Sequence, residues 1–338
     1  MMKLTIYDIA KALDLAPSTI SKVINNKGSA SEATRKRVLE YIKEVGYVPS
    51  NSARMLKSSN SYTIGIVFTE ELNIGLEHSF FSSILQHFKT EVEKEGYELS
   101  FIVTRMGKNK QSYYEWAINK KVDGIYIVTG DYNDQGILEL AEKNIPVVST
   151  DIFMKGIKTT ISDNIQGIQL SLDYLFNEQK LKTVGLIAGP LQSKAFQIRY
   201  DAYLNYFKEH NHEVISSYIV EAESFGFTSG YQAATNLIIN NEKLPEGLLV
   251  GSDDIALGVL RAFKDNNISV PNDIQIIGFD DIQYAKHFTP NLTTIRQNRA
   301  LMGQTAAKNL IEMIRDKEAD IEDLTLIPVE LIKRETTK

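Results

Sequence analysis

The 338-residue sequence is 43% hydrophobic and 24% charged, a composition that is ordinary for a globular protein of two or three domains. It contains no cysteine, which excludes disulfides, thiol nucleophiles and thiolate metal sites and agrees with a reducing compartment. No apolar run approaches the roughly 18 residues of a membrane span, and the alternating start MMKLTIYDIAKAL is unlike a secretory signal. We therefore expect a cytoplasmic protein that makes no membrane contact.

The charges are unevenly distributed along the chain, whose formal net charge is −6. Residues 1–61 hold ten Lys or Arg and five Asp or Glu, a net charge of +5, so the remaining residues carry −11. A small basic segment joined to a large acidic one indicates a module that binds a polyanion, followed by a part with another task.

Residues 1–49 predict three short helices. On either side of a tight turn, apolar residues recur at helical spacing at Ile6, Ile9, Ala10, Leu13, Ile20, Val23 and Ile24. Pro17 suits the first position of the second helix, whose expected outer face is Ser18, Thr19, Ser21, Lys22 and Asn25. A third helix from about Glu32 to Val45 is expected to bury Val38, Leu39, Ile42 and Val45. The pattern predicts a helix-turn-helix unit, and a generic three-helix bundle is the alternative.

Residues 62–338 alternate strand-like runs with helical segments. The strand-like runs are YTIGIVF, YELSFIV, DGIYIV and IPVVST, and then KTVGLIAG, EGLLVGSD and IQIIGFDD. Continuous apolar strands separated by helices predict parallel sheets with helices on both faces, here in two lobes. Ligands of such sheets bind beyond the carboxyl ends of the strands.

Polar side chains gather at those strand ends. They are Asp151, Ser193, Ser252, Asp253, Asp254, Asp280 and Asp281, with Arg199 on a following helix and Phe80 and Phe81 after the first strand. Carboxylates accept hydroxyl protons, a guanidinium forks onto two oxygens, and flat rings pack on a sugar, so the group suits a small polyol. A single Asp at a strand end is as often a helix N-cap, so the hypothesis depends on the grouping.

Other chemistry finds little support in the sequence. His210 and His212 have a spacing that can hold a metal, but no third ligand follows and an exposed turn is the better interpretation. There is no P-loop and no G-x-S-x-G, and Tyr113, Tyr114 and Trp116 have the spacing of helix packing. We expect no catalytic residues, no metal and no cofactor.

Several segments resemble the lac repressor and galactose repressor family of bacterial transcriptional regulators. They are TIYDIAKALDLAPSTISKVINN, SEATRKRVLEYIKEVGYVPS and NSARML in the first part, and GSDDIALGVLRAF, DIQIIGFDDIQYA and PNLTTIRQNRALMGQTAA in the second. The resemblance implies an α/β protein: an all-α helix-turn-helix head (1–49), a hinge helix and linker (50–61) and a two-lobed, periplasmic-binding-protein-like body with parallel sheets (62–338). The expected N-lobe is about 62–160 plus 292–321, and the expected C-lobe is about 161–291 plus 322–338.

The resemblance also implies which residues of the head meet DNA. The second helix would enter the major groove and present Pro17, Ser18 and Lys22 to base edges. Phosphate contacts or bracing are implied for Thr5, Tyr7, Thr19, Ser21, Asn25, Ser31 and Thr34. Three positions depart from the family pattern: Asp14 replaces the usual turn glycine, Ala16 removes a capping hydroxyl, and Lys22 replaces the commoner Arg.

The hinge segment is implied to form a helix only when two copies pair on DNA. Leu56 would then be an apolar wedge in the minor groove, Ala53 would permit close approach, and Arg54 and Lys57 would face phosphate. Effector contacts are implied for His78, Phe80, Phe81, Asp151, Ser193, Arg199, Phe225, Ser252, Asp280 and Gln297. Asp253 is expected to support its loop.

The resulting hypothesis is a homodimeric repressor that binds a roughly palindromic double-stranded operator under control of a small sugar. The chain ends at KRETTK without heptads, which favours a dimer over a tetramer. Effector binding is expected to reorient the lobes about crossings near residues 160, 290 and 322. Alternatives within the fold are control by a phosphocarrier protein or a purine corepressor. A sugar-binding transport protein and a sugar-processing enzyme are alternatives of other classes.

Overall fold

The computed structural model describes residues 4–24, 30–47, 60–68, 76 and 78–338. The chain divides into two compact units, Met1–Ser61 and Tyr62–Lys338, called here the head and the body. The boundary coincides with the change from the basic first 61 residues to the acidic remainder of the sequence.

The described residues of the head form three helices, α1 (Ile6–Leu13), α2 (Pro17–Ile24) and α3 (Glu32–Glu44). Thr5 and Asp8 form a capping box at the start of α1, in which each side chain bonds the backbone N–H of the other. Asp14 ends α1 in the left-handed region (φ 50°), as expected for an Asp at the turn position. Ala16 accepts the first backbone bonds of α2 through its carbonyl but offers no capping side chain.

The core of the head confirms most of the predicted apolar faces. Its buried members are Ile9, Ala10, Leu13, Ile20, Val23 and Val38. Two expectations are wrong: Leu39 is 48% exposed, and Ser21, expected on the outer face, is only 8% exposed. Leu39 lies one residue beyond Val38 and therefore about 100° around the helix, and Tyr41 and Ile42 pack against the core instead.

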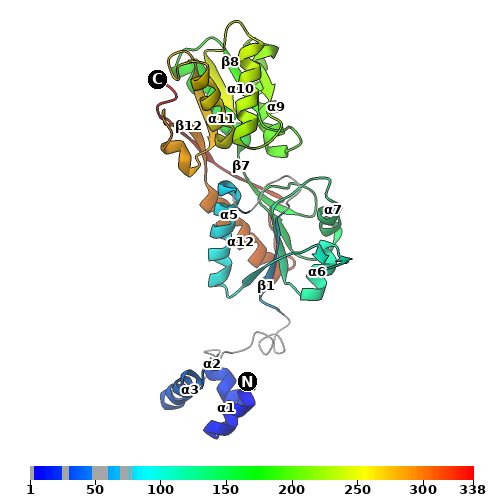
Figure 1. Ribbon diagram of the computed structural model, residues 1–338. Coiled ribbons are helices and arrows are strands. Elements are labelled where there is room, and N and C mark those ends of the chain that lie inside the picture. The colour runs from blue at the N-terminus through cyan, green and yellow to red at the C-terminus, as the bar shows by residue number, and fades with distance from the viewer. Residues whose placement is uncertain (1–3, 25–29, 48–59, 69–75, 77) are drawn as a thin grey trace. The chain divides into compact units, whose positions relative to one another are not determined.

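The N-lobe of the body is built on a sheet of six parallel strands, with β2 and β13 at its edges. The strands are β1 (Thr63–Phe68), β2 (Glu98–Phe101), β5 (Gly124–Thr129), β6 (Val147–Ser149), β7 (Lys158–Ser162) and β13 (Leu324–Ile327). Helices α5 (Ser79–Lys94) and α12 (Arg299–Arg315) pack together on one face, and α6 (Tyr113–Lys120) and α7 (Gln135–Glu142) cover the other (Figure 1). A small hairpin, β3 (Arg105–Met106) with β4 (Asn109–Lys110), precedes α6.

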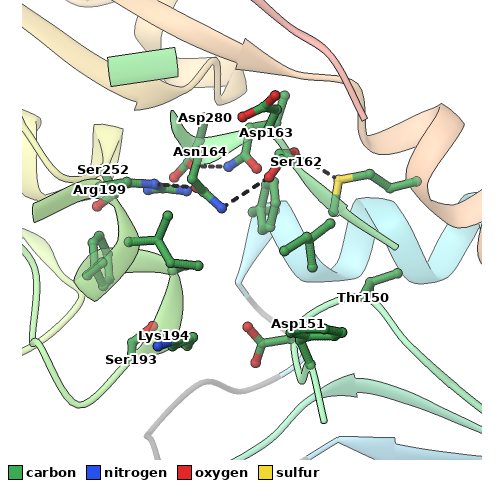
Figure 2. A pocket seen from close by; sticks show the side chains of 18 of the residues that line it. Thr150, Asp151, Ser162, Asp163, Asn164, Ser193, Lys194, Arg199, Ser252 and Asp280 are labelled. Atoms are coloured by element: carbon green, nitrogen blue, oxygen red, sulfur yellow. Dashed lines mark hydrogen bonds between the residues drawn. The ribbon is translucent and has the colours of Figure 1, made fainter. Parts of the chain in front are cut away.

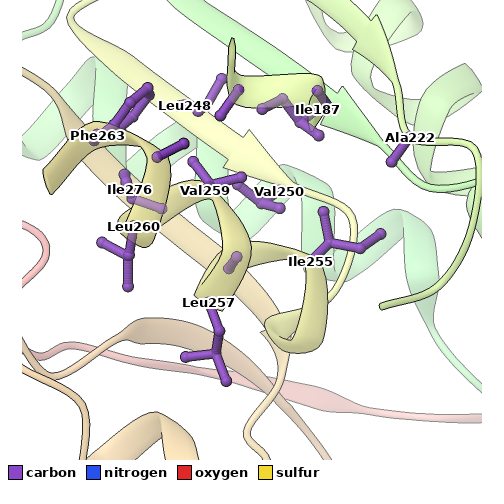
Figure 3. Packing of buried hydrophobic residues seen from close by; sticks show 14 of the residues in the cluster. Ile187, Ala222, Leu248, Val250, Ile255, Leu257, Val259, Leu260, Phe263 and Ile276 are labelled. Atoms are coloured by element: carbon purple, nitrogen blue, oxygen red, sulfur yellow. The ribbon is translucent and has the colours of Figure 1, made fainter. Parts of the chain in front are cut away.

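The C-lobe repeats this architecture with one antiparallel edge strand. Its strands are β8 (Val184–Ala188), β9 (Ile219–Glu221), β10 (Gly247–Val250), β11 (Gln275–Asp280), β12 (Thr293–Gln297) and the antiparallel β14 (Val329–Ile332). Helices α10 (Phe227–Ile239) and α11 (Asp253–Asp265) cover one face. The other face carries α8 (Asn164–Asp173), continued by the π-turn Tyr174–Glu178, and α9 (Lys194–Glu209). Figure 3 shows α11 packing Ile255, Val259 and Phe263 over the sheet.

Three segments cross between the lobes, later than predicted. β7 ends at Ser162 before α8 begins, β12 ends at Gln297 before α12 begins, and β13 ends at Ile327 before β14 begins. β12 therefore belongs to the C-lobe and β13 to the N-lobe, so the predicted lobe boundaries at 292 and 322 are wrong by about six residues. Pro328 stands at the last crossing, where a residue without an N–H separates the two strands.

No helix among the described residues is long and apolar enough to span a bilayer.

Candidate functional site

A cavity of about 370 Å³ lies between the two lobes of the body. All ten predicted effector residues line it: His78, Phe80, Phe81, Asp151, Ser193, Arg199, Phe225, Ser252, Asp280 and Gln297. They come from strand ends and from the starts of the following helices, which is where open parallel sheets place their binding sites (Figure 2). The volume is in the range of small-molecule sites in proteins.

Arg199 is the buried cation of this cavity and is 6% exposed. Its Nε donates to Asn164 Oδ1 at 2.7 Å and its Nη1 donates to the Gly251 carbonyl at 2.6 Å. The guanidinium also lies over the Phe279 ring, 3.6 Å from its centroid. Burial lowers the pKa of Arg199 to about 10, while Asp280, Asp253 and Asp151 act in the opposite direction, so the side chain stays charged at neutral pH.

Asp280 ends β11 in an unusual backbone conformation, with φ at 124°. Its Oδ1 accepts a hydrogen bond of 2.5 Å from Gln297 Nε2. Burial raises the pKa of Asp280 to about 7, against the opposing effect of Arg199. Protonated and ionised forms are therefore both accessible near neutral pH.

Asp253 points into the protein beneath the cavity. Its carboxylate accepts bonds from Thr294 Oγ1 at 2.6 Å and from the Ile282 N–H at 2.9 Å, and the residue is fully buried. Burial, followed by the nearby Asp280, raises its pKa to about 8. The prediction that Asp253 supports its loop is confirmed. Ser252 is the N-cap of α11, where its Oγ accepts from Ile255 N at 3.4 Å.

Asp151 provides a carboxylate from the N-lobe. Its Oδ2 accepts from Thr129 Oγ1 at 2.8 Å and from the Gly130 N–H at 3.2 Å. Burial raises its pKa despite these bonds. Figure 2 shows this carboxylate directed to the side of the cavity on which Ser193 and Lys194 lie.

Most of the remaining lining is apolar. The rings of Phe80 and Phe81 meet edge to face, with their centroids 5.1 Å apart. The ring centroids of Phe196 and Phe225 are 5.4 Å apart. The sequence did not identify several lining residues, namely Phe153, Ile161, Asn164, Lys194, Phe196, Met302, Leu324 and Leu326. Ile161, Leu324 and Leu326 belong to strands β7 and β13, which the hydrophobic pattern did not reveal.

His78 and Asp254 face one another across the two lobes. The distance between His78 Nε2 and Asp254 Oδ2 is 3.9 Å, which is too long for a hydrogen bond. Burial lowers the pKa of His78 and raises the pKa of Asp254, and the attraction between the two groups acts against both shifts. Within the described residues, His78 Nδ1 is buried without a hydrogen-bond partner.

The residues of the head predicted to meet DNA divide into exposed and structural groups. Pro17, Ser18 and Lys22 are exposed on α2, Tyr7 is 74% exposed on α1, and Thr19 is half-buried. Thr5 caps α1, and Ser31 caps α3 by accepting from Thr34 N at 3.2 Å. Asn25, Ala53, Arg54, Leu56 and Lys57 lie outside the described residues.

The histidine pair of the C-lobe packs on aromatic rings. His210 stacks on Tyr206 at 4.0 Å and His212 stacks on Phe176 at 3.9 Å. No group of three potential ligands occurs in the described part of the chain. Trp116 is buried and packs with Tyr113 and Tyr114 in the N-lobe, as predicted.

Known proteins resemble the chain over nearly its whole length. Residues 5–50 match the model for bacterial regulatory proteins of the lacI family, and residues 174–337 match the periplasmic binding protein-like domain. The HTH-type transcriptional repressor PurR of Glaesserella parasuis serovar 5 (strain SH0165) is 31% identical over 316 residues, 92% of this chain and 90% of that protein. The chain belongs to the lacI family.

Further relatives agree with this assignment. The probable HTH-type transcriptional repressor ExuR of Bacillus subtilis (strain 168) is 29% identical, covering 95% of this chain and 94% of that protein. A crystal structure of the lac repressor dimer bound to operator and the anti-inducer ONPF superposes with a TM-score of 0.82 at 25% identity over 99% of both chains. This lacI-family member is a DNA-binding transcriptional repressor with the predicted fold.

Proposed function

We propose that this lacI-family repressor acts as a cytoplasmic homodimer, without catalytic activity, whose operator affinity is set by a small neutral polyol, most simply a sugar. The observation that supports this effector class is the arrangement of Asp280, Arg199 and Asp151 around one aromatic-lined cavity. Carboxylate oxygens accept from hydroxyls, and the Phe rings offer flat apolar faces to a sugar ring.

The polar groups argue against the other effectors. A purine site favours more aromatic stacking and fewer carboxylates than this cavity, which Asp280 and Asp151 line. Control by a phosphocarrier protein alone would leave the aromatic-lined cavity between the lobes without a ligand. A sugar-binding transport protein would not need the basic head, and neither would a sugar-processing enzyme.

On DNA, the proposal gives α2 the role of reading bases. Lys22 and Ser18 are exposed there and would reach base edges, while Tyr7, Thr19, Ser31 and Thr34 would hold or brace the phosphate backbone. Residues 50–61 would hold the hinge helix and the linker, with Leu56 as the minor-groove wedge. In this proposal the sugar is an inducer, which means that it binds the DNA-free arrangement of the lobes more tightly. Such a ligand lowers the affinity of the repressor for its operator.

A panel of sugars tests the effector class. Neutral mono- and disaccharides, phosphosugars and purine bases are added to the full chain, and thermal unfolding and calorimetry report binding. We expect a neutral sugar to bind the wild type and Asp201→Asn with similar affinity, because the Asp201 carboxylate accepts from Gln197 on α9 and Asp201 is exposed, and to bind Asp280→Asn much more weakly. Binding of a purine alone, or turnover of a glycoside, would overturn the proposal.

A further inference from the structure

The turn that follows β11 is strained and is held by many side chains. Asp280 and Asp281 are consecutive residues with positive φ, 124° and 51°, although neither is glycine. Such conformations cost of the order of 1–3 kcal/mol each and persist only where the surroundings enforce them. They gather at binding and switching sites.

Most of the groups that hold this turn come from the C-lobe. Gln297 bonds the Asp280 carboxylate, and Arg296 Nε bonds Asp281 Oδ2 at 2.7 Å. Arg334 forms an ion pair with the other oxygen of Asp281. Burial alone would raise the pKa of Asp281, but the bonds from Arg334 and Arg296 hold it below its usual value. The turn is therefore fixed firmly to its own lobe.

One further contact reaches the turn from the N-lobe. Arg299, the first residue of α12, donates from Nη1 to the Asp280 carbonyl at 3.4 Å and from Nη2 to the Asp281 carbonyl at 3.1 Å. Among the described residues of the N-lobe, Arg299 is the one whose side chain forms hydrogen bonds with Asp280 and Asp281. A guanidinium fork fits two adjacent carbonyls only while the peptide between them keeps this orientation.

Arg299 is rigidly connected to the opposite wall of the cavity. Helix α12 lies so close to α5 that a Cβ at Gly303 would come within 2.5 Å of the Ile84 carbonyl. Helix α5 begins beside His78 and carries Phe80 and Phe81 into the cavity. The path from the Asp280 carboxylate through the turn, Arg299 and α12 to α5 is thus continuous, and every step is a covalent connection, a hydrogen bond or a close helix packing.

We propose that Arg299 is the positioning residue that transmits the state of the Asp280 turn from the C-lobe to the α12–α5 pair of the N-lobe. The proposal rests on the proposed function, in which a ligand hydroxyl at Asp280 competes with Gln297 for the carboxylate. The turn then changes the orientation of its peptide, and the fork of Arg299 loses one carbonyl. Because the Nη1 contact is already the longer of the two, it is the one that breaks first.

A double-mutant cycle in the full chain tests this without any ligand. Asp280→Asn perturbs the turn from the cavity side, and hydrogen–deuterium exchange of residues 79–88 reports on α5. We expect Asp280→Asn to change exchange there at least threefold in the wild-type background and less than 1.5-fold in Arg299→Met. Arg299→Lys retains the charge without the fork and is expected to give an intermediate response.

Arg315→Met is the matched control, because Arg315 is at the other end of α12 and pairs with Glu95 on the surface. In that background the threefold response is expected to remain. A response of equal size in Arg299→Met, or none in the wild type, would overturn the role of Arg299. The sugar panel is scored separately: absence of any sugar binding would refute the proposed effector class while the exchange cycle still decides the contact.

Discussion

The two lobes of the body share one architecture but contribute different chemistry to the cavity. The C-lobe supplies Arg199, Asp280 and Ser252, whose polar atoms are fixed by hydrogen bonds to neighbouring strands and helices. The N-lobe supplies Phe80, Phe81, Met302 and other apolar side chains, with Asp151 as its main polar group. The difference suggests a division of tasks, in which the C-lobe orients a ligand and the N-lobe closes over it.

The first prediction concerns whether the lobes unfold together. Phe88 in the N-lobe and Phe263 in the C-lobe are both fully buried, so Phe88→Ala and Phe263→Ala each remove about 3–5 kcal/mol of stability. Trp116, the single tryptophan, lies in the N-lobe and reports its unfolding by fluorescence. Because three segments join the lobes, we expect both substitutions to lower the Trp116 midpoint equally. An unchanged midpoint in Phe263→Ala would show that the lobes unfold independently.

The second prediction concerns the polar half of the cavity. Asp280→Asn is expected to weaken sugar binding by about 100-fold at pH 8, where the wild-type carboxylate is mostly ionised and accepts from a ligand hydroxyl, and calorimetry measures the loss. The same substitution alters the dependence of stability on pH. The pKa of Asp280 is raised to about 7 by burial, so the folded state binds this proton more tightly than the unfolded chain.

The direction of this pH dependence follows from the proton that the folded state holds on Asp280. The contribution of Asp280 to stability is complete below the unfolded pKa near 4 and is lost as pH rises through about 7. We therefore expect Asp280→Asn to match the wild type near pH 4 and to have a Tm several degrees higher at pH 8. A wild type that is more stable than the variant at pH 8 would contradict the raised pKa.

The third prediction concerns the apolar half. Phe81→Ala is expected to weaken sugar binding roughly tenfold, about 1.4 kcal/mol, which is less than the effect of Asp280→Asn. Phe101→Ala is the control, because Phe101 is exposed on the edge strand β2 and is not among the lining residues. If Phe81→Ala removed as much affinity as Asp280→Asn, the proposed division between the lobes would be wrong.

The fourth prediction, with the smallest expected effect, compares two serines of the head: Ser31, which caps a helix, and Ser18, which is proposed to contact DNA bases. Ser31→Ala removes the N-cap of α3 and is expected to cost about 1 kcal/mol, seen as faster hydrogen exchange in residues 32–44. Ser18→Ala, on the exposed face of α2, is expected to leave that exchange unchanged and to weaken operator binding. Equal exchange in both variants would refute the structural role of Ser31.

Sequence reasoning located the cavity better than it located the lobes. Asp151, Ser252 and Asp280 were identified because each follows an apolar strand, and the carboxyl ends of parallel strands meet at one edge. Strands β7 and β12 were missed because they contain the buried threonines Thr159, Thr160, Thr293 and Thr294. The hydroxyls of Thr293 and Thr294 bond partners distant in sequence, Thr337 and Asp253, which no local pattern reveals.

The lobe boundaries predicted at 292 and 322 were wrong because neighbouring strands were not recognised. Without β12 and β13, nothing in the sequence shows where the chain leaves one sheet for the other, and the lining residues Leu324 and Leu326 were lost with β13. In the head, Leu39 was misplaced because hydrophobicity alone does not decide the edge of a helix face. The contacts of Arg299 with backbone carbonyls were likewise invisible, since carbonyl positions depend on the fold.

The three crossings between the lobes also affect what happens to a truncated chain. Residues after 297 supply α12 and β13 to the N-lobe and β14 to the C-lobe, so each lobe is discontinuous in sequence. A chain that ends between β12 and α12 lacks α12 and β13 in the N-lobe and β14 in the C-lobe, so we expect it to expose hydrophobic surface in both lobes and to be susceptible to proteases. We therefore expect truncated copies to be degraded, so that a head joined to an incomplete body does not accumulate and occupy operators without control.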